Sequence, residues 1–96
     1  MSSETVDESP CDGYHFPGYF FSENAVGNPT FLRIRDLSSI VHDQKRELLL
    51  VSMNGGEEFG FNPKTIERMY KRSISMNTEG VDPSVMLFRL LEYYSK

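Results

Sequence analysis

The apolar positions near the C-terminal end of the sequence are too dense for a helix with a single buried face. Eight of the ten residues in 85–94 are apolar or aromatic. At about 100° per residue they cover roughly 220° of a helix surface, whereas a surface helix needs an apolar stripe of only about 100°. We therefore expect other elements of the domain, or a partner, to cover the excess.

Two proline dipeptides indicate where two helices begin. Asn62-Pro63 and Asp82-Pro83 each place a capping side chain before a proline at the first helical position. The first helix is expected to run from Pro63 to about Met76, and the second from Pro83 to the end of the sequence. The first helix has an apolar face, made of Ile66, Met69, Tyr70 and Ile74, and an opposite basic face, made of Lys64, Arg68, Lys71 and Arg72.

Alternating apolar and polar positions predict strands before these helices. In residues 30–36, Leu32 and Ile34 share one face, and the other carries Phe31, Arg33 and Arg35. Residues 46–53 hold a short apolar run of strand length, which predicts a central strand. The segment from Leu37 to Leu48 fits the spacing of a strand and that of a helix, so both interpretations remain open.

The sequence Asn54-Gly55-Gly56 predicts a tight hairpin turn, because Asn-Gly supplies the two positive-φ positions that such a turn needs. Residues 57–61 would form the returning strand, with Phe59 and Phe61 on one face and Gly60 at a bulge or a close approach. The predicted fold class is α+β: a small antiparallel sheet of three to five strands followed by two C-terminal helices packed on one face.

The N-terminal residues differ from the rest in charge and in aromatic content. Residues 1–13 carry four acidic and no basic side chains, so the remaining ten acidic groups (14 − 4) balance the ten basic ones. We expect a disordered acidic tail over 1–13 and a single domain over 14–96. Residues 14–21 hold five of the twelve aromatic residues. This segment is a strand of the domain's own core, a docking motif, or an arm swapped into a second copy.

The composition offers little for catalysis or metal binding. Cys11 is the only cysteine, so neither an intramolecular disulfide nor a cysteine-based metal site can form. The only histidines are His15 and His42, and the sequence contains neither a Gly-X-Ser-X-Gly nucleophile elbow nor a phosphate-binding loop. We expect no catalytic residue, no metal and no cofactor.

The expected location is the cytoplasm or the nucleus, without a membrane partner. No stretch approaches the roughly 18 consecutive apolar residues of a membrane-spanning helix. The first residues also lack the basic and apolar regions of a signal peptide.

The second helix is the best candidate for a contact surface. We expect Leu87, Phe88 and Leu91 to point into the domain. The outward, partner-binding set would be Met86, Leu90, Tyr93 and Tyr94. Methionine and tyrosine are enriched at the centres of protein interfaces, so the pattern indicates a non-enzymatic protein–protein interaction module that forms a homodimer or docks a protein partner. The competing explanation buries the helix between the first helix and the sheet.

A small single-stranded nucleic-acid (RNA) binding domain is the alternative hypothesis. Six cations could contact phosphates, or an acidic protein partner: Arg33, Arg35, Lys64, Arg68, Lys71 and Arg72. Phe31 could add stacking on a base. Against this, the sequence pI is about 5.1 and residues 14–96 are neutral overall.

Overall fold

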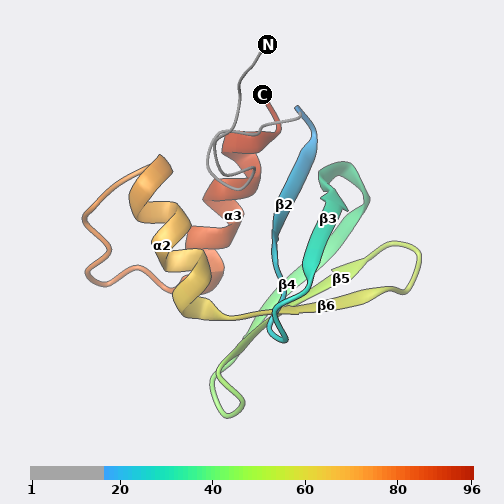
Figure 1. Ribbon diagram of the computed structural model, residues 1–96, viewed down its shortest axis with the longest axis horizontal. Helices are drawn as coiled ribbons and strands as arrows, with labels where there is room; N and C mark the ends of the chain where they lie inside the picture. Colours follow the sequence, from blue (N-terminus) through green and yellow to red (C-terminus); the bar gives the residue numbers. More distant parts are fainter. Residues whose placement is uncertain (1–16) are drawn as a thin grey trace.

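A computed structural model describes residues 17–96. The strands come first, in the order β2 (Tyr19–Glu23), β3 (Pro29–Arg33), β4 (Leu37–Asp43), β5 (Leu48–Met53) and β6 (Glu58–Phe61), and the helices α2 (Pro63–Ser73) and α3 (Pro83–Tyr94) follow. Figure 1 shows the two helices together on one side of the strands. The predicted α+β class, antiparallel with C-terminal helices, is confirmed.

The strands form two antiparallel sheets instead of one. β2 pairs with β3, and β5 lies between β4 and β6. A 3-10 turn over Ile34–Asp36 separates β3 from β4, so the predicted strand over residues 30–36 ends at Arg33. The segment that fitted both a strand and a helix forms β4 and the turn after it. The predicted central strand is confirmed as β5.

The hairpin between β5 and β6 forms at the predicted place with a different geometry. The Gly56 amide donates to the Met53 carbonyl oxygen at 3.0 Å, and Met53 N donates to the Glu57 carbonyl oxygen at 2.8 Å. Gly56 has a φ of +94°, whereas Asn54 and Gly55 keep negative φ. The expectation of two positive-φ residues at Asn54 and Gly55 is therefore wrong, because this longer turn needs the left-handed conformation only at its last residue.

Both helices begin at the predicted caps. The side chain of Asn62 accepts a hydrogen bond from Lys64 N, and that of Asp82 accepts one from Ser84 N. These bonds satisfy amides that the first turn leaves without a partner. α2 ends at Ser73, three residues before the predicted end.

The core lies where α3 meets α2 on one side and the strands β2 and β4 on another (Figure 1). Its buried apolar side chains come from every strand except β4 and from both helices: Phe20, Leu32, Leu49, Val51, Met53, Phe61, Ile66, Met69, Tyr70, Met86, Leu87, Leu90, Leu91 and Tyr94. Phe20 meets Phe61 and Tyr94 with ring centroids 5.9 Å and 5.7 Å apart. Of the aromatic segment, residues 19–21 thus belong to a strand of the domain, and Tyr14 to Phe16 lie outside the described residues.

Candidate functional site

Three of the four α3 side chains predicted to face outward are in the core. Met86, Leu90 and Tyr94 are 3%, 0% and 9% exposed, whereas Tyr93 is 45% exposed. The prediction of an outward apolar set is therefore wrong for these three residues. The physical reason is the position of α3, which packs against α2 on one side and against β2 and β4 on another.

Phe88 departs from the prediction in the opposite direction. It was expected to point inward with Leu87 and Leu91, yet it is 54% exposed. The five buried residues of α3 span an arc of about 140° at 100° per residue, and Phe88 lies outside that arc. The next residue of α3 contacts α2, because the Arg89 guanidinium donates a hydrogen bond of 2.9 Å to the Tyr70 hydroxyl.

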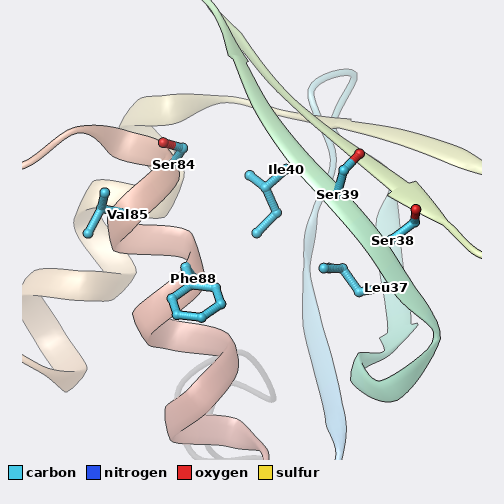
Figure 2. A pocket seen from close by; sticks show the side chains of 7 residues that line it. All are labelled: Leu37, Ser38, Ser39, Ile40, Ser84, Val85 and Phe88. Carbon is cyan, nitrogen blue, oxygen red and sulfur yellow. The ribbon is translucent and has the colours of Figure 1, made fainter.

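The exposed ring of Phe88 lines an apolar groove between β4 and α3. Figure 2 shows Leu37 and Ile40 of β4 pointing toward the helix that carries Phe88. The groove has a volume of about 380 Å³ and no charged residue in its lining: Leu37, Ser38, Ser39, Ile40, Ser84, Val85 and Phe88. Val85 is 40% exposed, and Leu37 and Ile40 are half-buried. The predicted site lay on α3 alone, whereas β4 contributes four of the seven residues that line this groove.

The strand side of the groove follows from the register of β4. Ile40 pairs with Val51 and Leu37 with Met53, so both side chains share the core-facing side of the sheet with buried neighbours. β4 is an edge strand, however, and α3 covers these two side chains only in part. The sequence therefore gives little indication of the groove, since the pattern around Ile40 is that of an ordinary buried residue of a strand.

A polar cluster ties the start of α3 to β4. The Asp82 carboxylate accepts hydrogen bonds from the hydroxyl and the amide of Ser84 and, at 3.2 Å, from His42 Nδ1. The bonds from Ser84 hold the pKa of Asp82 below its ordinary value, and His42 adds to this shift. Because Asp82 lies between His42 and Ser84, the hydroxyl is bonded to the carboxylate and not to the imidazole. This arrangement caps a helix and lacks the nucleophile–base pair of a hydrolase.

The six cations predicted as a nucleic-acid or acidic-partner surface do not form one face. Four lie on α2, and Arg33 and Arg35 lie at the end of β3 and in the turn that follows. Figure 1 shows α2 and β3 on opposite sides of α3.

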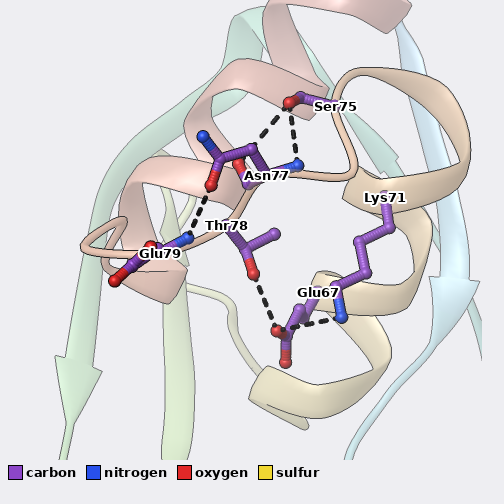
Figure 3. Close-up of polar contacts among 6 residues, drawn as sticks. All are labelled: Glu67, Lys71, Ser75, Asn77, Thr78 and Glu79. Atoms are coloured by element: carbon purple, nitrogen blue, oxygen red, sulfur yellow. Dashed lines mark hydrogen bonds and ion pairs between the residues drawn. The ribbon is translucent and has the colours of Figure 1, made fainter.

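The basic face of α2 is also partly neutralised. Lys71 pairs with Glu67 at 3.6 Å, and Glu67 accepts a hydrogen bond from the Thr78 hydroxyl at 3.2 Å (Figure 3). Asn77 in turn accepts from the Glu79 amide at 3.3 Å. The hydrogen bond between Thr78 and Glu67 connects α2 to the loop that leads to α3, and Lys71 pairs with the same carboxylate from within α2.

Within residues 17–96, no three His, Cys, Asp or Glu side chains come close enough together to hold a metal ion. Among the same residues, neither helix has the length and apolar character to span a membrane. Comparisons with protein-family profiles, with curated protein sequences and with solved structures gave no match.

Proposed function

We propose that this chain is a non-enzymatic protein-interaction module that docks an extended segment of a partner protein in the groove between β4 and α3. The observation that carries the proposal is Phe88, an aromatic side chain that is 54% exposed on the rim of an uncharged groove. A large apolar side chain in such a position gains free energy when a partner removes it from water, by about 25 cal/mol per Å² of apolar surface buried.

The backbone of β4 favours an extended partner. β4 pairs with β5 along one edge, and no strand among residues 17–96 pairs with its other edge. An edge strand presents amide and carbonyl groups that can bond to an added strand, while alternate side chains of that strand enter the neighbouring pocket. The groove of Leu37, Ile40 and Phe88 lies beside this edge, so one segment could use both features.

The opposite edge of the same sheet is less suited to this role. β6 has only four residues, and its Gly60 carbonyl oxygen already accepts a hydrogen bond of 2.7 Å from Ala25 N. β4 has seven residues. The longer edge and the apolar groove therefore coincide on one side of the molecule.

The size of the groove favours a partner segment over a second copy of the chain. A volume of about 380 Å³ holds a few side chains, whereas stable protein interfaces bury about 1,200 Å² or more in total. Met86, Leu90 and Tyr94 are buried, so three of the four residues through which the homodimer was predicted to form are not available for contact. Pairing of β4 with β4 of a second copy remains an outcome of the test.

The test selects peptides that bind the full chain from a random peptide library and measures their affinity for two matched variants. Phe88→Glu places a charge in the groove and should weaken binding at least tenfold, about 1.4 kcal/mol. Tyr93→Glu makes the same change on the same helix, on the side away from the groove, and should leave the affinity within about twofold. Selected peptides should carry alternating apolar residues and no charge at those positions.

Three results would contradict the proposal. One is a set of peptides that bind equally well to Phe88→Glu and to the parent chain. Another is a loss of binding confined to Tyr93→Glu, which would place the contact on the other side of α3. The third is a chain that light scattering shows to be a dimer and that Phe88→Glu converts to a monomer, because the groove would then serve self-association.

A further inference from the structure

A second cleft lies between the outer face of β2–β3 and the hairpin that joins β5 to β6. Its volume is about 500 Å³, and it shares no lining residue with the groove described above. Aromatic rings from three strands line it: Tyr19 of β2, Phe31 of β3 and Phe59 of β6. The cleft therefore needs an explanation of its own.

The rings gather on the exposed side of β2–β3 because of the strand register. Phe21 is paired with Phe31, and Tyr19 with Arg33, so these side chains share the face opposite to buried Phe20. Tyr19 and Phe31 stack with centroids 5.0 Å apart and planes 9° apart, and Phe21 meets Phe31 edge-on at 5.8 Å. Phe31 is nevertheless 49% exposed. Tyr19 and Phe31 each turn one ring face to the other, so a cation can meet only a ring face outside this stack. Such a face carries partial negative charge and attracts cations.

Charged side chains complete the lining of the cleft. Asp36 and Glu57 contribute two carboxylates, and Arg33 contributes one guanidinium. The Asp36 carbonyl oxygen accepts a hydrogen bond of 2.7 Å from Asn54 N, which holds the 3-10 turn against the hairpin. Within residues 17–96, the side-chain carboxylates of Asp36 and Glu57 form no hydrogen bond and no ion pair. The lining thus combines aromatic rings with an excess of one negative charge.

We propose that this cleft binds the cationic side chain of a lysine or arginine residue on a protein partner. The rings of Tyr19 and Phe31 would contact the side chain, and Asp36 and Glu57 would face its charge. The positive charge of Arg33 opposes the binding of a cation, so removing it tests whether the cleft prefers a cation or an anion. Because the carboxylates repel phosphate, a nucleic acid is disfavoured in the same cleft. This inference does not depend on the groove between β4 and α3.

The experiment follows backbone amide shifts of the full chain by nuclear magnetic resonance during titration with capped pentapeptides. The probes are Gly-Gly-Lys-Gly-Gly and Gly-Gly-Arg-Gly-Gly, and the uncharged control replaces the central residue with norleucine. We expect shifts at Phe31, Gly55 and Glu57 with the charged peptides only. Combining Asp36→Asn with Glu57→Gln, which preserves side-chain size, should weaken binding about fivefold.

Arg33→Gln separates a cation site from an anion site. It should strengthen binding of the charged peptides about twofold, because it removes a like charge. The inference is overturned if no amide of the cleft shifts, or if the norleucine peptide binds equally well. It is also overturned if Arg33→Gln weakens binding, or if a single-stranded oligonucleotide binds the cleft and Arg33→Gln abolishes that binding. The spectrum of each variant reports its folding directly, so a loss of binding cannot be mistaken for unfolding.

Discussion

Leu90 and Phe88 are two positions apart on α3 and have opposite environments. Leu90 is fully buried, whereas Phe88 is 54% exposed. Leu90→Ala should therefore destabilise the chain by about 2–5 kcal/mol, since it removes buried methyl groups and leaves a cavity. Phe88→Ala should cost about 1 kcal/mol or less, because much of its surface is already in water. Urea unfolding of the two variants measures both values.

Equal losses in the two variants would contradict this assignment of faces. Because Leu90 is buried, a substitution at this position cannot test a surface contact. Leu90→Glu would bury a charge without a partner and unfold the domain. A change in association caused by that variant would therefore reflect loss of the core.

Side-chain type alone could not place the residues of α3. Phenylalanine and leucine are both purely apolar, and methionine and tyrosine are common at interfaces, which led to the prediction that Phe88 is inside and Met86 outside. The outcome depends on which neighbours α3 meets. Tyr70 of α2 accepts a hydrogen bond from Arg89, a contact across 19 positions that no local pattern reveals.

At the level of elements, the hairpin after β5 offers a matched pair of glycines. Neither Gly55 nor Gly56 has a neighbouring atom within 4 Å of the position of an added Cβ, so only backbone conformation distinguishes them. Gly56→Ala should cost about 1–2 kcal/mol, because φ is +94° there. Gly55→Ala should change stability by about 0.5 kcal/mol or less. Thermal unfolding of both variants tests the difference, and similar melting temperatures would contradict the turn geometry.

A buried tyrosine hydroxyl lies in the contact between α2 and α3. Tyr70 is 2% exposed and its hydroxyl accepts from the Arg89 guanidinium. Tyr70→Phe should destabilise the domain by about 1.5–3 kcal/mol, the usual contribution of a hydrogen bond to a charged group. In a double-mutant cycle with Arg89→Ala, measured by urea unfolding, the effects should be less than additive. Full additivity would show that this bond does not couple the helices.

Local signals predicted the helices well and the arrangement of the strands less well. Asn62 and Asp82 act through bonds to residues two positions away, so the sequence suffices to find both helix starts. The division into two sheets depends on the turn over Ile34–Asp36, whose alternating pattern also fits a strand. The groove was not predictable, because Ile40 and Phe88 meet only through the packing of β4 against α3.

At the level of the whole molecule, α3 is fastened at both ends to strands that precede it in the sequence. At its start, Asp82 accepts a hydrogen bond from His42 of β4. At its end, the Tyr94 carbonyl oxygen accepts a hydrogen bond of 2.9 Å from Gly18 N, next to β2. The groove lies along the helix between these two hydrogen bonds. Both bonds therefore help to hold α3, one side of the groove, in position relative to the strands.

The hydrogen bonds of Asp82 make the free energy of unfolding depend on pH in the acidic range. Hydrogen bonds from Ser84, with a smaller contribution from His42, lower the pKa of Asp82 in the folded chain below its ordinary value of 3.8. A group with a lowered folded-state pKa stabilises the fold above its unfolded-state pKa, and this contribution is lost as the pH falls through the folded-state pKa. The pKa of Asp43 is lowered in the same direction, chiefly by the hydrogen bond from the Arg46 side chain. Stability should therefore decrease below about pH 4.

The variant Asp82→Asn measures how much Asp82 contributes to this decrease of stability at low pH. Asparagine keeps an oxygen that can accept the bond from the Ser84 amide and cap α3, but it does not ionise. The free energy of unfolding of the variant, from urea titrations between pH 2.5 and 6, should decrease less steeply toward acid than that of the parent chain. Ser84→Ala keeps the carboxylate and removes the hydroxyl hydrogen bond that lowers the pKa of Asp82 most, so its slope should be intermediate. If the slopes of Asp82→Asn and the parent chain coincide, the junction of β4 and α3 does not respond to pH through Asp82.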